Sequence, residues 1–361
     1  MANAILTSAI DALASRRDLS ADETAAVLAE IMHGDVSATQ IAAFLIALRT
    51  KGETVDELTG LARTMRELAA HVPTTRDDLL DTAGTGGGRR TFNVSTTAAL
   101  IAAGAGCAVA KHGNRSATSS SGSADVLEAL GARIDLTPAG VARCIEQAGF
   151  GFMFAPAHHQ ATRYVVPVRH ELAVRTIFNF LGPLTNPAGA RRQLIGVSDA
   201  TFVETIAGAL ARLGVDRALV VCSEDGLDEL SVASATKVIE VNGEEISRYT
   251  LVPADVGVEQ FAPEVVERDC AGGTPEQNAA VTRAIFGIAT EPEHSPVVAT
   301  PAGVELAVLN AGAAIYVGGL ADSVAQGVEA ARSALADGAA ARALEGFVRA
   351  SDANAPAEVA R

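Results

Sequence analysis

The first 70 residues repeat apolar side chains at the spacing of an α-helix. Such repeats place the apolar residues on one helix face. Three apolar runs also follow a hydroxyl residue that has Glu or Gln three positions later, the pattern of an N-terminal capping box. The recurring positions are Ile5, Leu6, Ala9, Ile10 and Leu13, and the box pairs are Ser20 with Glu23, Ser37 with Gln40 and Thr54 with Glu57. This pattern predicts a small unit of about four helices.

From residue 80 onward, short apolar runs alternate with helical patterns, which is typical of an α/β fold. The strand candidates are residues 107–110, 150–154, 194–197 and 218–222. Between the last two lies a helical run that Gly214 ends, and a strand–helix–strand unit implies parallel strands. We predict a large α/β domain with a mainly parallel central sheet plus a small N-terminal α-helical domain. The helical domain is expected to span residues 1–72, with residues 163–190 rejoining it, and the α/β domain residues 73–162 and 191–361.

Two polar loops carry the strongest chemical signal. The first reads GTGGGRRTFNVST over residues 84–96, and the second reads KHGNRS over 111–116 and continues through serines to Ser123. Glycines let backbone N–H groups approach an anion, and an alanine-rich helix after Thr96 offers its N-terminus to a phosphate. A purely structural glycine turn and a solvated serine-rich linker are the alternative interpretations. The first loop fits neither the P-loop nor the dinucleotide-binding pattern.

An acidic cluster follows the strand at 218–222 and contains Glu224, Asp225, Asp228 and Glu229. Mg²⁺ prefers such oxygen ligands and shares them with substrate phosphates, whereas an isolated cluster would be a solvated loop. Beside two phosphate-type loops, we assign Asp228 and Glu229 to a metal. The net charge of −15 argues against nucleic acid or an anionic membrane as a partner.

Three further side chains have two possible interpretations each. Arg169 can grip a carboxylate with two hydrogen bonds or form a surface salt bridge. His112 and His159 can carry protons or serve as structural hydrogen-bonding groups. The four cysteines show no metal-ligand spacing, and we expect reduced, buried thiols in a cytoplasmic protein with neither a membrane span nor a secretory signal.

Taken together, these segments resemble the anthranilate phosphoribosyltransferase family over nearly the whole chain. The matching segments are Arg49 to Thr54, GTGG at 84–87, FNVST at 92–96, residues 111–116, GSAD at 122–125, residues 175–187, residues 225–229 and LNA at 309–311. The resemblance implies a homodimer that uses anthranilate, phosphoribosyl pyrophosphate and Mg²⁺. It also implies a fold of the nucleoside-phosphorylase type.

The resemblance assigns roles to individual residues, and it implies no covalent or obligatory acid–base catalytic residue. The phosphoribosyl pyrophosphate contacts would be Gly84, Gly87, Gly88, Thr91, Asn93, Val94, Ser95, Thr96, Lys111, Ser119 and Ser123. The anthranilate contacts would be Gly84, Asn114, Arg169, His112 and His159. The Mg²⁺ ligands would be Ser95, Asp228 and Glu229.

The first loop departs from the family pattern. The family usually carries Gly-Thr-Gly-Gly-Asp-Gly here, whereas in this chain the loop is one residue shorter and Gly87 is followed by Gly88, Arg89 and Arg90. Our hypothesis is an altered Mg²⁺ dependence. Two alternatives stay open: a related phosphoribosyltransferase or pyrimidine nucleoside phosphorylase with another acceptor, and a nucleic-acid-binding protein on the same fold.

Overall fold

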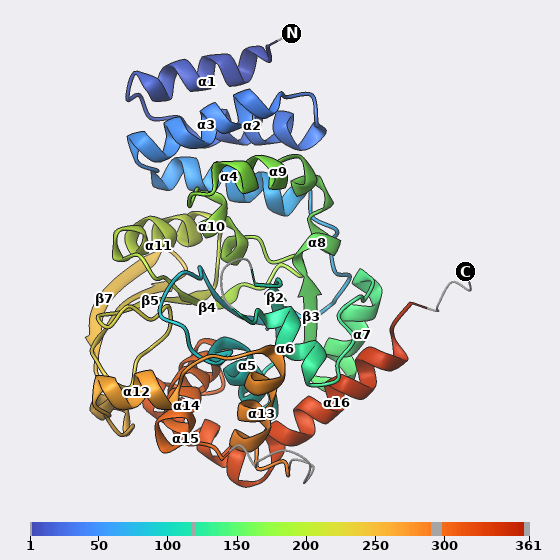
Figure 1. Cartoon of the computed structure of the whole chain (residues 1–361), viewed down its shortest axis with the longest axis vertical. Coiled ribbons are helices and arrows are strands. Elements are labelled where there is room, and N and C mark those ends of the chain that lie inside the picture. The colour runs from blue at the N-terminus through green and yellow to red at the C-terminus, as the bar shows by residue number, and fades with distance from the viewer. Residues whose placement is uncertain (1, 117–119, 290–297, 357–361) are drawn as a thin grey trace.

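A computed structural model describes residues 2–116, 120–289 and 298–356 of the chain. Its first part is a stack of four helices, which lies at the top of Figure 1 and confirms the predicted helical unit. The helices are α1 (Ala4–Ala14), α2 (Ala21–His33), α3 (Ala38–Lys51) and α4 (Val55–Glu67). The apolar repeat therefore produced the expected elements.

Two of the three predicted capping boxes are complete. The boxes at Ser20 and Thr54 have both of their hydrogen bonds. At Ser37 the side chain accepts from the Gln40 N–H, but the Gln40 side chain bonds the backbone of Asn3 instead of returning to the cap. The prediction of a full box at Ser37 was wrong because Asn3, a distant residue in the sequence, offers Gln40 better-placed partners.

The α/β part is built on one seven-stranded sheet with the order β3-β2-β1-β4-β5-β6-β7. The strands β1 to β5 run parallel, whereas β6 and β7 continue the sheet as an antiparallel hairpin. The bounds are β1 (Leu80–Gly84), β2 (Val109–Gly113), β3 (Phe150–Phe154), β4 (Arg192–Gly196), β5 (Arg217–Ser223), β6 (Thr236–Asn242) and β7 (Glu245–Leu251). The predicted mainly parallel sheet is confirmed.

The sequence pattern placed some strands inaccurately and missed others. The predicted strand at 107–110 is β2, which begins at Val109 and runs on through Lys111 and His112. These two residues are strand residues rather than loop residues, because the buried Lys111 ammonium group finds two oxygen acceptors on Thr82 of β1 and a third on Ser95 in the helix that follows β1. The predicted strand at 194–197 is shifted to β4. Strand β1 and the β6–β7 hairpin were not predicted at all.

Helices cover both faces of the sheet (Figure 1). They are α5 (Val94–Gly104), α6 (Ser123–Ala129), α7 (Pro138–Ala148), α8 (Ala155–His158), α9 (Val166–Leu172), α10 (Phe178–Leu181), α11 (Val203–Arg212), α12 (Pro263–Asp269), α13 (Pro275–Ile285), α14 (Pro301–Val317), α15 (Val324–Ala336) and α16 (Ala339–Ala353). Alternate residues of β5 enter two different cores: Leu219 joins the cluster with α5 and α14, and Val220 joins the cluster with α11 and the first four helices. This alternation is the two-residue period of a strand buried on both faces.

Residues 163–190 leave the α/β part and return beside the first helices. Val165, Val168 and Ile177 belong to the same buried cluster as Phe44 and Leu48 of α3. Figure 1 shows α9 with the first helices, above the sheet. The division of the chain at residue 72, with this segment rejoining the helical unit, stays a prediction that this packing favours.

The four cysteines are buried and unpaired, as expected. Within the described ranges, each helix is too short or too polar to cross a lipid bilayer.

A buried ion pair joins α3 to α4. The Lys51 ammonium lies 3.0 Å from Glu57, and these side chains are only 4% and 0% exposed. The Glu57 carboxylate also accepts the N–H groups of Leu19 and Thr54. It therefore fixes three segments of the helical unit at one point.

We predict that Glu57→Ala lowers the free energy of unfolding by about 3–5 kcal/mol, because it leaves the buried Lys51 without its nearest buried partner. Denaturant unfolding checks this. The matched control is Arg17→Ala, which removes an exposed pair with Glu23 and should cost less than about 1 kcal/mol. Equal losses in the two variants would contradict the prediction.

Candidate active site

The polar loops meet at the carboxyl ends of the parallel strands. Gly84 ends β1, Gly196 ends β4 and Ser223 ends β5. The sheet order reverses between β1 and β4, since β2 and β3 lie on one side of β1 whereas β4 and β5 lie on the other. Ligands of open α/β sheets bind at such a switch point. The fold therefore places the glycine-rich loop and the acidic loop where a ligand is expected.

The glycine-rich loop and the acidic loop are in direct contact. The Gly86 N–H donates to Oδ2 of Asp228 at 2.8 Å, and the Arg89 N–H donates to the Gly226 carbonyl at 3.1 Å. A Cβ on Gly84 would lie 2.5 Å from Oδ2 of Asp228, and a Cβ on Gly196 would overlap the Asp228 backbone oxygen. Glycine at these strand ends is what lets Asp228 sit against the sheet.

Asp228 and Glu229 face Ser95 across a small cavity. The cavity measures about 10 Å³, which is room for one water-sized sphere. Burial raises the pKa of both carboxyl groups, that of Glu229 strongly, and the neighbouring Asp228 raises the Glu229 pKa further. Oε2 of Glu229 is buried without a hydrogen-bond partner in the described part of the chain. A bound cation would offset the repulsion between the carboxylates and give this oxygen a partner.

This oxygen donor set fits Mg²⁺. Two adjacent carboxylates and one hydroxyl leave coordination positions for substrate phosphates, the usual arrangement for this ion. The described residues contain no group of three or more His, Cys, Asp or Glu side chains that could hold a metal by themselves.

Lys111 is buried beside this cavity. Its ammonium donates to the Thr82 carbonyl and hydroxyl and lies 3.3 Å from the Ser95 Oγ, and the side chain is 1% exposed. Burial lowers the pKa of Lys111 to about 8, while the Asp81 and Glu229 carboxyl groups act to raise it. Lys111 therefore positions Ser95 and places a positive charge next to the two acidic side chains.

The amino end of α5 carries several of the predicted phosphate contacts. Asn93 precedes the helix, bonds Ser121 and accepts from Asn278 at 2.8 Å. These bonds join the glycine-rich loop to the serine-rich loop. Val94 and Thr96 are buried, and the Thr96 hydroxyl has no hydrogen-bond partner among the described residues.

The remaining predicted phosphate contacts are spread around this helix end. Thr91 pairs with Ala271 in an isolated β-bridge. Gly87 has a positive φ of 83°, and Gly88 packs against the Gly226 carbonyl. Ser123 begins α6 and lies against Gly113. Ser119 lies outside the described residues.

The residues predicted to contact anthranilate, apart from Gly84, fall into two groups. Arg169 on α9 is half-buried over the Phe178 ring and forms no salt bridge within the described residues. Burial lowers its pKa. Asn114 is exposed just after β2, and its Oδ1 accepts from the Arg115 N–H.

His112 and His159 form the second group. Their rings lie 5.1 Å apart, and each bonds a backbone carbonyl, Gly182 for His112 and Thr185 for His159. Burial lowers the pKa of His112 to about 3 and that of His159 to about 4. Both rings are therefore neutral near pH 7. Nε2 of His112 is buried and has no partner in the described chain.

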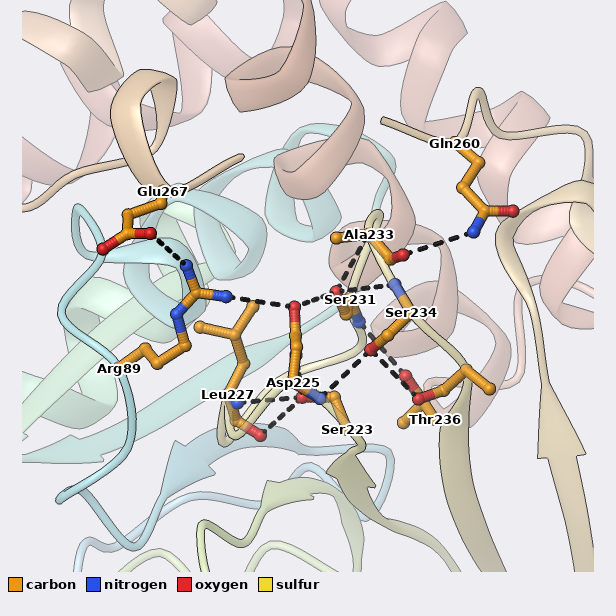
Figure 2. A network of polar contacts seen from close by, with 11 residues as sticks. Arg89, Ser223, Asp225, Leu227, Ser231, Ala233, Ser234, Thr236, Gln260 and Glu267 are labelled. Atoms are coloured by element: carbon orange, nitrogen blue, oxygen red, sulfur yellow. Dashed lines mark hydrogen bonds and ion pairs between the residues drawn. The ribbon is translucent and has the colours of Figure 1, made fainter. Parts of the chain in front are cut away.

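Asp225 does not point at the metal cavity. Its carboxylate accepts from the Ser223 and Ser231 hydroxyls at 2.6 and 2.7 Å and faces Arg89 at 3.5 Å (Figure 2). The Arg89 guanidinium also reaches Glu267 at 3.7 Å. The acidic cluster is therefore divided: Asp225 anchors the short loop through Arg89, whereas Asp228 and Glu229 line the cavity.

Comparison with known proteins decides the family. Residues 76–341 match the glycosyl transferase family a/b domain, and residues 7–69 match the helical bundle domain of that family. The chain is 49% identical over 348 residues to anthranilate phosphoribosyltransferase of Rubrobacter xylanophilus, covering 96% of this chain and 98% of that protein. This chain belongs to the anthranilate phosphoribosyltransferase family.

Solved structures agree with this assignment. The anthranilate phosphoribosyltransferase of Thermus thermophilus is 42% identical with a TM-score of 0.86, and the match covers 95% of this chain and 99% of that one. The enzyme of Saccharomyces cerevisiae in complex with PRPP and Mg is 26% identical with a TM-score of 0.84, covering 98% and 99%. The fold class implied by the resemblance is confirmed.

Within this anthranilate phosphoribosyltransferase fold, three residues at the site were missed by sequence reasoning. They are Gly196, Ser198 and Arg175. Gly196 makes room for Asp228, and both Ser198 and Arg175 donate to the Gly86 carbonyl. The glycine at a strand end was a visible signal for Gly196. Arg175 opens a segment of family resemblance but received no role, and no local signal marked Ser198, because the Gly86 carbonyl that both side chains bind lies about a hundred residues away in the sequence.

We predict that acid destabilises the protein through His159. Between pH 6.5 and about 4 the unfolded chain binds a proton at this ring that the folded chain excludes, so stability falls as the pH falls and is unaffected above this window. From about pH 7 to about pH 5, wild type should lose about 2 kcal/mol more than His159→Asn. Denaturant unfolding at both pH values measures this.

The control is His71→Asn, since His71 is exposed. That variant should lose as much stability as wild type on acidification. If His159→Asn did so too, the ring would not be the group that excludes the proton.

Proposed function

We propose that this chain transfers the phosphoribosyl group of phosphoribosyl pyrophosphate to the amine of anthranilate, giving N-(5-phosphoribosyl)anthranilate and pyrophosphate. Membership of the family supports the reaction. The observation that carries it in this chain is the junction of the Gly86 N–H with Asp228, beside the unpaired carboxylate oxygen of Glu229. The net charge of the chain is −15, so a polyanionic substrate needs a cation to bind it. The contact between Gly86 and Asp228 places carboxylate oxygens where they can hold such a cation.

Mg²⁺ is the proposed cofactor, and Ser95, Asp228 and Glu229 would hold it. The yeast relative was solved with PRPP and Mg. Bound Mg²⁺ would supply positive charge that offsets the departing pyrophosphate. Lys111 fixes the Ser95 hydroxyl, and the Gly86 N–H keeps one Asp228 oxygen in place. These contacts hold the ligand oxygens in position before the substrate arrives, which limits reorganisation during the reaction.

The phosphoribosyl pyrophosphate site is proposed to extend from the glycine-rich loop to the amino end of α5. Free N–H groups at a helix N-terminus and at glycine turns bind phosphate oxygens. The residues are those assigned above: Gly84, Gly87, Gly88, Thr91, Asn93, Val94, Ser95, Thr96, Lys111, Ser119 and Ser123. Asn93 holds the two loops together through Ser121, so both ends of one ligand can be held at once.

The anthranilate site is proposed to use Gly84, Asn114, Arg169, His112 and His159. Arg169 would bind the carboxylate, because its guanidinium has no acidic partner within the described residues. The histidines line the approach as neutral rings, since burial lowers the pKa of both. The aromatic amine of anthranilate is unprotonated near neutral pH, so no side chain has to remove a proton before attack. Catalysis then rests on positioning and on leaving-group electrostatics.

The alternative functions find no support. The relatives described above carry the anthranilate phosphoribosyltransferase name rather than that of a nucleoside phosphorylase. A nucleic-acid-binding role would require a basic surface, and the net charge of −15 opposes it. An assay of anthranilate fluorescence with phosphoribosyl pyrophosphate and Mg²⁺ tests the proposed reaction; a chain that consumes no anthranilate would refute it.

The proposal also includes the oligomeric state, the cellular location and the domain division of the protein. The protein would act as a homodimer in the cytoplasm. Its helical domain would comprise residues 1–72 together with 163–190, and the rest would form the α/β domain. The packing of Val165 and Ile177 with the first helices supports this division. Light scattering of the purified protein tests the dimer.

We predict that Arg169→Ala raises the KM for anthranilate by about 10- to 100-fold, because a charge-assisted hydrogen bond contributes about 1.5–3 kcal/mol. The KM for phosphoribosyl pyrophosphate should change by less than about twofold. Steady-state kinetics with each substrate varied in turn measures both. The matched control is Arg163→Ala, an exposed arginine of the same segment, which should leave both constants unchanged. Equal effects of Arg169→Ala on both substrates would refute the assigned role.

We also predict that the missing loop carboxylate sets the Mg²⁺ dependence. A Cβ on Gly88 would lie 2.9 Å from Oδ1 of Asp228, so an Asp inserted after Gly87 would bring a third carboxylate to the cavity. The Mg²⁺ concentration for half-maximal rate should then shift by about threefold or more, equivalent to about 0.7 kcal/mol. An Asn inserted at the same place is the control for loop length. Identical magnesium titrations for the two insertions would contradict the hypothesis.

A further inference from the structure

Arg175 binds the glycine-rich loop through the backbone carbonyl of Gly86. Its Nη1 donates to the Gly86 carbonyl at 3.0 Å and lies 3.3 Å from the Ser198 Oγ, which donates to the same carbonyl at 2.8 Å. The Gly86 N–H meanwhile donates to Asp228. Both backbone polar groups of Gly86 are therefore fixed by side chains from distant segments.

The backbone of Arg175 is itself anchored to the helical unit. Nη1 of Arg49, on α3, donates to the Arg175 carbonyl at 2.7 Å. The Arg175 guanidinium lies over the Phe180 ring, which stacks on Phe202 with 3.9 Å between ring centroids. Arg49 opens a segment of family resemblance to which the proposed function assigns no role. A continuous set of contacts thus runs from α3 through Arg175 and Gly86 to Asp228.

The positive charge of Arg175 acts on the Asp228 carboxyl group, whose pKa it lowers, without forming a direct salt bridge in the described chain. Among the described residues it forms no ion pair, and its Nη2 is buried without a hydrogen-bond partner. A Cβ on Gly87 would collide with Nη1 of Arg175, so the guanidinium lies directly against the turn. A buried polar atom such as this Nη2 usually has a hydrogen-bond partner.

We propose that Arg175 is a positioning residue for pyrophosphate binding: it locks the Gly86–Gly87 turn against Asp228 and places a positive charge without a direct salt-bridge partner beside that turn. Arg49 acts through it by holding its backbone. This inference rests on the proposed function, because it assigns the glycine-rich loop to the pyrophosphate end of the substrate. It adds a residue that touches the loop rather than one that touches the reacting atoms.

The first test compares Arg175→Met and Arg175→Lys with wild type. Calorimetry with pyrophosphate and Mg²⁺ should show a Kd about tenfold higher for Arg175→Met, and a smaller rise for Arg175→Lys, which keeps the charge but loses the planar fork. The kcat should fall by about 10- to 100-fold, while the KM for anthranilate changes by less than about twofold. The control is Arg191→Met, whose exposed side chain pairs with Asp216 and which should behave as wild type.

The second readout needs no ligand. In Arg175→Met, amide hydrogen exchange of the Gly86 N–H should speed up about tenfold or more, because the turn is freed from one of its anchors. Exchange in the core strand β5 should stay unchanged, which separates a loosened turn from a loosened fold. Unchanged exchange at Gly86 together with an unchanged pyrophosphate Kd would overturn the proposal.

A double-mutant cycle tests the part played by Arg49. Arg49→Met should raise the pyrophosphate Kd about threefold in the wild-type background and have no further effect in Arg175→Met. Additive effects would overturn the assignment of Arg49. If Arg175→Met fails to fold, the same comparisons are made with Arg175→Lys and Arg49→Met, and wild-type affinity in both would overturn the proposal. Failure of the wild-type protein to bind pyrophosphate or to consume anthranilate would instead refute the proposed function.

Discussion

The site depends on the close approach of two loops that come from opposite sides of the switch point in the sheet. Asp228 can lie against the strand ends because Gly84 and Gly196 have no side chain, and its Oδ2 then accepts the Gly86 N–H. A methyl group at either glycine would push the acidic loop away. Everything proposed for metal and pyrophosphate binding requires this contact.

Charge is the second constraint on the site. The chain is strongly acidic, yet its proposed substrate is a polyanion, so local groups must overcome the general field of the protein. Lys111 and Arg175 place positive charge near Asp228 and Glu229, and the causes of the carboxyl pKa shifts include both cations. Burial nevertheless raises the pKa of both carboxyl groups, because it disfavours their charged forms, and a bound divalent cation would offset that cost.

The two faces of the sheet serve different purposes. One face packs on α5 and α14 in a large apolar core, and this core fixes the helix N-terminus proposed for phosphate binding. The other face shares its core with the first four helices and with α9 and α10. The latter cluster carries Arg169 and holds the backbone of Arg175 through Arg49. The proposed anthranilate site and the anchor of the glycine-rich loop therefore both rest on the core that the first four helices share with α9 and α10.

The sequence by itself determined the elements whose signals are local. The first four helices follow from apolar spacing and caps, and the βαβ unit around α11 follows from its strand and helix patterns. The glycine-rich loop, Asp228 and Glu229 were selected as site candidates by residue type and by their position after a strand. Strand β1 and the β6–β7 hairpin were missed, because β1 mixes Asp81 and Thr82 with small residues and the exposed residues of β7 hide an apolar period.

Only the tertiary structure decided how the polar groups are divided among roles. Asp225 and Asp228 belong to one acidic cluster, and the structure shows the different partners of each: serine hydroxyls and Arg89 contact the first, whereas the second lines the cavity proposed for the metal. Lys111 resembles a loop cation until its three buried acceptors, two on Thr82 and one on Ser95, are known. Arg175 resembles one more surface arginine until its contact with Gly86 is seen. Contacts between residues far apart in the chain decide these roles, and such contacts leave no periodic trace in the sequence.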